Sequence, residues 1–270
     1  MGTLPDFVKP LGLDIIIALD GRPVLIELQS GFGRRGLIAL LPAANALYRK
    51  TLRCLREDLG RDLFLARQMR RICGDKIRTY RLFSRYQPAS FAFRGWGGAA
   101  RRWLDRIKPG FVLAKPPRGC CGKGILVFER DSLRTRPDLL PPGRSYLLQE
   151  HLDSKRFNDD EGRPHAGCMR HIVLLQGQEG RLNFMHLPSY WRVSPIPIGD
   201  ERRQESLIAN ISRGGYPLIA DEGDAAPARR LAEQVAMDLV RHIMQIPDLR
   251  RDRSLVIGQR ASRISPIASQ

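Results

Sequence analysis

The segment Phe111–Phe128 constrains the fold most, because a glycine-rich loop joins two apolar runs in it, FVLA and ILVF. Short apolar runs around such a loop predict a β-hairpin. Three glycines and two lysines stand between or beside the runs: Lys115, Gly119, Gly122, Lys123 and Gly124. Glycines let backbone N–H groups approach a ligand and lysines add positive charge, which is typical of a polyphosphate-binding loop. No GK[ST] opens a helix here, so this is not the Walker pattern, and an ordinary hairpin with solvated lysines is the alternative.

The net charge of +17 favours a polyanionic partner, whether a nucleotide, a nucleic acid or an anionic membrane surface. Part of this charge lies in tracts such as Arg67–Arg71 and Arg250–Arg253, which have the pattern of solvated helix faces or loops. The sequence has no RNP, helix-turn-helix or zinc-finger signature, and aromatic residues make up only 7% of it. Nucleic acid is therefore not the expected partner.

Cysteine usage and hydropathy predict a cytoplasmic protein with no membrane partner. The five cysteines are scattered without the paired spacing of a zinc site, so reduced thiols are expected. No apolar stretch reaches the roughly 18 residues that span a bilayer, and the first residues lack a signal-peptide pattern. The chain of 270 residues is long enough to bury a sizeable core, in one large domain or in two or three small ones.

A second hairpin is predicted near the N-terminus, where DIIIAL and PVLIEL flank an Asp-Gly pair. Asp14 begins the first strand. Glu27 and Gln29 lie two residues apart on the second, so they point to one face, whereas Ile26 and Leu28 point into a core. Three oxygen-bearing side chains at one edge of a hairpin suit Mg²⁺, which favours oxygen ligands. Alternatively, Glu27 and Gln29 form the polar face of a half-exposed strand.

Between the two hairpins, residues 37–107 are expected to be mainly helical. Periodicity and breaker residues predict helices over 37–55, 62–72, 76–86 and 99–107, and a short strand within 87–93.

After the central hairpin, apolar patterning predicts more strands and one long helix. The expected elements are a strand over 145–152, a polar loop over 156–168, paired strands over 169–177 and 180–195, an amphipathic helix over 227–244 and a partly disordered basic tail over 247–270. Arg170 and Arg192 lie on the paired strands. Each guanidinium offers a planar fork for a phosphate or a carboxylate, or else is an exposed edge-strand arginine.

Five segments together resemble the ATP-grasp superfamily of carboxylate–amine ligases. They are AKPPRGCCGKGI, YLLQEHL, MRHIVLL, WRVSP with NISRGG, and GLDIIIALDGRPVLIELQ. Asp75-Lys76 with Pro88 also resembles the start of the ATP-binding half in this family. In the family the metal-binding hairpin comes last, whereas here it comes first, which indicates a circular permutation. A rearranged gene, in which residues 1–36 belong to something else, is the alternative.

The resemblance implies an α+β fold, in which the antiparallel sheets of two α+β lobes sandwich ATP. It divides the chain into a metal-binding hairpin that completes the C-terminal lobe (1–36), a mainly helical connecting region (37–107), an ATP-binding lobe (108–152), the C-terminal lobe (153–246) and the basic tail (247–270). A hairpin can complete the same sheet from either end of the chain if the termini lie close together.

The resemblance also assigns site residues. The phosphates of ATP would be held by Lys115, Lys123 and backbone groups of Gly119, Gly122 and Gly124. Adenine would be lined by Gln149, Glu150 and Leu152. Mg²⁺ would be bound by Asp14, Glu27 and Gln29. The transferred phosphate or the acyl oxyanion would be held by Arg170, Arg192 and Asn210. The chain departs from the family at Gln29, usually Asn, at Met169, usually acidic, and at the loop tip, Cys120-Cys121.

The activity that the resemblance implies is ATP-dependent formation of an amide or peptide bond through an acyl phosphate. The substrates would be a small-molecule or peptide carboxylate and an amine, selected by variable loops over 30–36, 156–168 and 196–209. Gln29 and Met169 keep a second hypothesis open, a catalytically impaired nucleotide-binding protein of the same fold. A basic nucleic-acid-binding protein is the third hypothesis, and a homodimer is left open.

Overall fold

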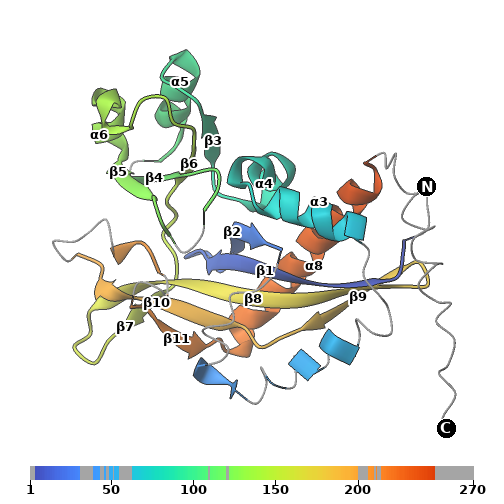
Figure 1. The fold of residues 1–270 in the computed structure, drawn as a ribbon. Coiled ribbons are helices and arrows are strands. Elements are labelled where there is room, and N and C mark those ends of the chain that lie inside the picture. Colours follow the sequence, from blue (N-terminus) through green and yellow to red (C-terminus); the bar gives the residue numbers. More distant parts are fainter. Residues whose placement is uncertain are drawn as a thin grey trace, which may run out of the picture.

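Two antiparallel β-sheets organise the chain and helices pack against them, so the architecture is α+β (Figure 1). This computed structural model describes residues 4–30, 39–42, 46, 49–50, 52–54, 63–108, 110–119, 122–199, 206–209, 211 and 214–246. Part of the helix expected over 37–55, the loop tip Cys120-Cys121, Asn210 and the tail 247–270 lie outside the described residues.

The larger sheet contains seven strands within these ranges. They are β1 (Phe7–Ile17), β2 (Pro23–Gln29), β7 (Arg156–Asn158), β8 (Pro164–Gln178), β9 (Arg181–His186), β10 (Tyr190–Pro197) and β11 (Tyr216–Ile219). The order is β11-β10-β8-β1-β2, and β7 and β9 also pair with β8. The long β8 is central, because β1 pairs along one edge while β9 and β10 share the other.

The N-terminal hairpin predicted from the Asp-Gly pair is confirmed, because β1 and β2 pair antiparallel. Asp14 lies in the middle of β1 rather than at its start, directly opposite Glu27 on β2. Since β1 also pairs with β8, the first strand of the chain lies inside the sheet next to Arg170, which is opposite Asp14.

A β-bulge in this hairpin corrects one expectation. The register shifts between Asp14 and Ile15, which leaves Ile26 as the extra residue on β2. Leu25 and Leu28 therefore face the apolar core, whereas Ile26 is half-buried and lines the cavity described below. The expectation that Ile26 points into the core is wrong, because the bulge interrupts the alternation of successive side chains between the two faces of the strand.

The prediction of a polar loop over 156–168 is also wrong, since β7 and the start of β8 form a hairpin there. Asp159 stabilises the turn, because its carboxylate accepts hydrogen bonds from the backbone N–H groups of Glu161 and Arg163. Gly162 supplies the positive φ of 76° that the turn requires.

A single strand expected over 180–195 is divided into β9 and β10. Pro188 lies between them and has no N–H group to donate to the ladder, so pairing with β8 is interrupted there.

The smaller sheet has the order β3-β6-β4-β5, with β3 (Ser90–Phe93), β4 (Phe111–Lys115), β5 (Leu126–Glu129) and β6 (Tyr146–Glu150). β4 and β5 pair antiparallel, which confirms the central hairpin. Two helices, α5 (Gly98–Arg106) and α6 (Arg130–Thr135), pack on this sheet, and Leu104, Leu133 and Leu148 share its core. A short 3-10 helix, Pro137–Leu139, follows α6.

Three further helices cover one face of the larger sheet (Figure 1). They are α3 (Leu63–Cys73), α4 (Lys76–Phe83), which continues as a 3-10 turn over Ser84–Tyr86, and α8 (Glu222–Met244). Met69, Phe83 and Val235 from these helices share a core with Leu13 and Trp191 of the sheet.

The helices α3, α4 and α5 confirm three of the expected ranges, 62–72, 76–86 and 99–107. The long helix α8 begins at Glu222 rather than at Pro227, because Asp221 caps it by accepting a hydrogen bond from the Asp224 N–H. None of the helices in the described ranges combines the length and apolar character needed to cross a membrane.

Candidate functional site

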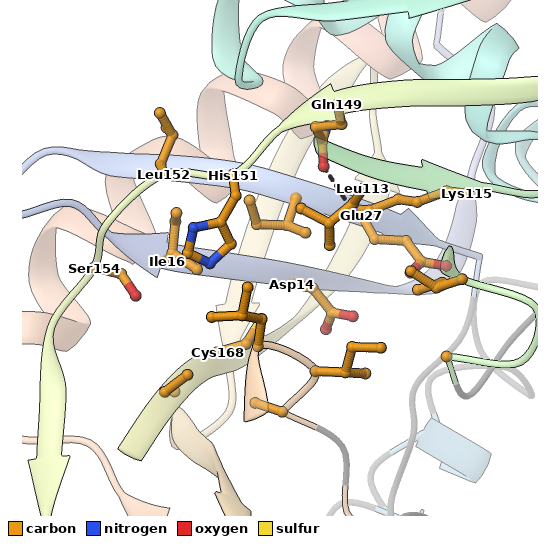
Figure 2. A pocket seen from close by; sticks show the side chains of 18 of the residues that line it. Asp14, Ile16, Glu27, Leu113, Lys115, Gln149, His151, Leu152, Ser154 and Cys168 are labelled. Atoms are coloured by element: carbon orange, nitrogen blue, oxygen red, sulfur yellow. Dashed lines mark hydrogen bonds between the residues drawn. The ribbon is translucent and has the colours of Figure 1, made fainter. Parts of the chain in front are cut away.

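A cavity lies between the two sheets, bounded by β4 and β6 on one side and by β1, β2, β8 and β10 on the other (Figure 2). Its empty volume is about 790 Å³, part of it open to solvent. Many residues assigned by the resemblance line it: Asp14, Glu27, Lys115, Gly122, Gln149, Glu150, Leu152 and Arg192.

Lys115 is the buried cation of the smaller sheet. It ends β4 and is only 4% exposed, and its Nζ donates a hydrogen bond of 2.5 Å to Oε1 of Gln149 on β6 (Figure 2). Gln149 in turn donates from Nε2 to the Ser90 hydroxyl at 3.1 Å. Burial lowers the pKa of Lys115 to about 8, so the lysine is charged at neutral pH at an energetic cost that a bound anion would offset.

The larger sheet contributes a buried network around Asp14. Its Oδ1 accepts a hydrogen bond from Arg170 Nε at 2.5 Å and lies 2.9 Å from Arg192 Nη2, and its Oδ2 accepts one from Arg170 Nη2 at 3.2 Å. Arg170 Nη1 also donates to Oε1 of Gln29 at 3.2 Å. Burial alone would raise the pKa of Asp14, but the two guanidinium groups outweigh it and hold this pKa below its usual range.

Arg192 has one donor to spare in this network. Its Nη2 reaches Asp14 and, at 3.1 Å, the Cys168 sulfur, but its Nε is buried and has no hydrogen-bond partner among the described residues. Arg192 lines the cavity, whereas Arg170 is not among its lining residues. A buried donor left unpaired is costly, so the Nε of Arg192 is a destabilising feature of this network.

Lys76 joins α4 to the cavity and to the glycine-rich loop. Its Nζ lies 3.4 Å from Oε1 of Glu27 and donates to the Gly119 carbonyl at 2.8 Å, and its backbone N–H donates to the Pro117 carbonyl at 2.8 Å. The motif Asp75-Lys76 is therefore connected to the site through Lys76, although the resemblance assigns no ligand contact to this lysine.

The glycine-rich loop reaches the cavity through Gly122 and Ile125 among its described residues. Gly122 lines the cavity, whereas Gly119, Lys123 and Gly124 are exposed beside it. Gly122 and Gly124 both have positive φ, 70° and 72°, which explains why glycines occupy these positions.

The other end of the cavity is mostly apolar. Ile16 and Leu152 line it together with the ring of His151 (Figure 2). Burial lowers the pKa of His151, which keeps its ring neutral at pH 7. The strand register separates the two ends, because Lys115 is opposite Leu147 on β6, three residues before Glu150. The resemblance named Leu152 as a residue that lines adenine, whereas sequence reasoning missed Ile16 and His151, since no motif assigns a role to either side chain.

The donor set fits a polyphosphate better than a bare cation. Four cations, Lys76, Lys115, Arg170 and Arg192, face two carboxylates, Asp14 and Glu27, and each carboxylate already contacts a cation. No group of three or more His, Cys, Asp or Glu side chains in the described part of the chain is close enough to hold a metal ion. Mg²⁺ would fit here together with phosphate oxygens, with Glu27 as its most accessible protein ligand.

No family model matches the chain, and no curated protein matches it. The arguments for a function therefore come from the cavity itself and from the motifs that line it.

The lowered pKa of Lys115 predicts a pH dependence of stability. The pKa is about 8 in the folded protein and near the ordinary lysine value of 10.5 in the unfolded chain. Between these values the unfolded state binds the additional proton, so Lys115 should make the free energy of unfolding rise from pH 8 to pH 10.5. Buried thiols titrate in the same range with the opposite sign, so the informative quantity is the difference between wild type and Lys115→Met in urea unfolding. If the difference in the free energy of unfolding between the two proteins stays constant from pH 8 to pH 10.5, the pKa of Lys115 is not lowered by burial.

Proposed function

We propose that the chain is an ATP-dependent carboxylate–amine ligase of the ATP-grasp type, with ATP in the cavity between the two sheets. The observation that carries the proposal is the division of this cavity into a cationic end, at Lys115, and an apolar end, at Ile16 and Leu152 (Figure 2). A nucleoside triphosphate has the same division, with charged phosphates at one end and a flat base at the other.

The fold supports the permuted order that this proposal needs. The N-terminal hairpin would have to complete the same sheet as the arginine strand, and β1 pairs with β8 along nine residues. Asp14 and Arg170 are opposite each other in that pairing, and Glu27 is opposite Asp14 on β2. Residues of the N-terminal hairpin and of β8, which are far apart in the sequence, are thus neighbours in one sheet.

In the proposed reaction, a carboxylate oxygen of the acid substrate attacks the γ-phosphorus of ATP. The bond from this phosphorus to the β–γ bridging oxygen breaks, and ADP leaves. The amine nitrogen then attacks the acyl carbon, the carbon–oxygen bond to phosphate breaks, and inorganic phosphate leaves while the nitrogen loses a proton to solvent. No side-chain nucleophile takes part.

The chain supplies positioning and electrostatic stabilisation for these steps. Lys115 would face phosphate oxygens, where a fixed cation in a buried site stabilises developing negative charge. Arg170 holds Asp14 in place and thereby orients Arg192. Mg²⁺, when bound with ATP, would neutralise phosphate charge beside Glu27.

A catalytically impaired nucleotide-binding protein is the second candidate, and Asp14 is the observation that favours it. Both of its oxygens accept hydrogen bonds from Arg170, which leaves this carboxylate poorly available to a metal ion. Met169 does not bear on the choice, because its side chain is in the core on the opposite face of β8.

Hydroxylamine trapping tests the proposed function. The protein is incubated with ATP, Mg²⁺, hydroxylamine and, in turn, amino acids, dicarboxylates and short peptides, and hydroxamate and phosphate are measured. The ligase reading predicts ATP-dependent hydroxamate with the matching acid, lost in Lys115→Met. ATP binding without phosphate release on any acid would favour the impaired protein, and absence of ATP binding would overturn both readings.

A further inference from the structure

A second hollow lies outside the cavity, where α3 ends, α4 begins and the loop after β4 passes. Its volume is about 900 Å³ and it is open to solvent. Five arginines line it, together with Gly74 and Asp75: Arg67, Arg70, Arg71, Arg78 and Arg118. We refer to this hollow as the arginine groove.

The charge of the arginine groove is not balanced by the fold. Within the described residues, no ion pair joins any of the five arginines to a carboxylate. The one carboxylate in the lining, Asp75, caps α4 by accepting a hydrogen bond of 3.1 Å from the Arg78 N–H.

Three of the arginines share one face of a single helix, which is unfavourable without a partner. Arg67, Arg70 and Arg71 stand at positions i, i+3 and i+4 of α3, where like charges destabilise a helix. Arg78 and Arg118 come from other segments and add to the same hollow. Such a concentration of unpaired cations around a concave surface fits a ligand with several negative groups.

The lining favours carboxylates over a nucleic acid. Single-stranded nucleic acids are bound on aromatic side chains that stack with bases, and the groove has no aromatic residue in its described lining. Guanidinium forks match carboxylates and phosphates alike in bidentate geometry, so the preference for a peptide rests on the absence of aromatic side chains in the described lining.

The arginine groove adjoins the phosphate end of the cavity. Asp75 lines the groove, and the next residue, Lys76, contacts Glu27 in the cavity. Arg118 also lines the groove, and Lys76 holds the residues on either side of it through the carbonyls of Pro117 and Gly119. A ligand in the groove therefore lies beside the loop that borders the proposed ATP site.

We propose that the arginine groove binds an acidic peptide, one with several Asp or Glu carboxylates, and that this peptide is the carboxylate substrate of the ligase. The role as substrate rests on the proposed function, whereas binding of the peptide does not.

The test measures binding of a fluorescent oligoglutamate peptide by anisotropy, using the full chain. The variant Arg70→Gln/Arg71→Gln removes two exposed arginines and retains good helix formers, so the fold should persist. The control, Arg101→Gln/Arg102→Gln, removes the same charge from exposed positions on α5, in the other sheet's layer (Figure 1). We expect the groove variant to bind the peptide about tenfold more weakly, and the control to bind within about twofold of wild type.

If both variants bind the peptide equally more weakly than wild type, the loss comes from the lower net charge rather than from the groove, and the proposal is overturned. Tighter binding of an oligodeoxythymidine probe than of the peptide, lost in the groove variant, would overturn it in favour of a nucleic acid. ATP binding is titrated separately on each protein. Failure of ATP binding with peptide binding intact refutes the proposed function alone, and the reverse refutes the peptide groove alone.

Discussion

Replacing Lys115 by methionine is expected to weaken ATP binding by roughly 10- to 100-fold. The lysine is buried between the sheets, and its charge is held there at a cost that a phosphate would offset. A charge-assisted hydrogen bond in such a place contributes about 1.5–3 kcal/mol, which corresponds to this range of affinity. Methionine has a similar length and no charge, and calorimetric titration with ATP measures the change.

Lys108→Met is the matched control, because Lys108 is exposed and lies outside the cavity lining. It should bind ATP as wild type does. Equal losses in the two variants would mean that general surface charge, rather than the buried Lys115, attracts the nucleotide.

Replacing Asp14 by asparagine is expected to lower the free energy of unfolding by about 3–5 kcal/mol. The substitution leaves Arg170 and Arg192 buried without a counter-charge, and removing one partner of a buried ion pair typically costs this much. Urea unfolding measures the change, and circular dichroism at low denaturant checks that the variant folds.

Asp20→Asn provides the control for Asp14. Asp20 pairs with Arg22 in the exposed turn of the same hairpin, so its loss should cost no more than about 0.5 kcal/mol.

The stabilising contribution of Asp14 should also depend on pH, because its pKa is lowered in the folded protein. The contribution is complete above the unfolded pKa of 3.8 and declines as pH falls through the folded pKa. If Asp14→Asn unfolds at the same urea concentration as wild type, the buried network does not stabilise the fold.

Local patterns in the sequence identified the two hairpins well. The Asp-Gly pair before Arg22 and the glycine-rich loop after Lys115 both join antiparallel strands, as predicted. Turn chemistry acts over a few residues, so it can be read without knowing the rest of the fold. The bulge at Ile26 escaped this reasoning, because it depends on how β2 pairs with its neighbour.

The electrostatics of the site could not be predicted from the sequence, because they depend on long-range pairing. Asp14 meets Arg170 across 156 positions of sequence, and Lys115 meets Gln149 across 34. The resemblance named Asp14 as a metal ligand, Lys115 and Arg170 as phosphate ligands and Gln149 as a residue that lines adenine, and it gave no indication that Asp14 is bound by two arginines. The register of β1 against β8 brings Asp14 to Arg170, and the pairing of β4 with β6 brings Lys115 to Gln149.

The arginine groove illustrates the same limit. Arg67, Arg70 and Arg71 form a tract with the pattern of a solvated helix face, and on α3 alone they are exposed. Arg118 follows β4, far along the sequence, and the hydrogen bonds of Lys76 hold the loop that carries it against α4. A concave cationic surface results from this contact between segments, which no window of sequence contains.

The central claim is that the cavity between the two sheets binds ATP as its magnesium complex. Calorimetric titration of wild type and Glu27→Gln with ATP, each with and without Mg²⁺, tests it most directly. The account predicts one site on wild type, binding strengthened by Mg²⁺ by about tenfold, and loss of this strengthening in Glu27→Gln. Absence of ATP binding by wild type, or identical Mg²⁺ dependence in both proteins, would contradict it.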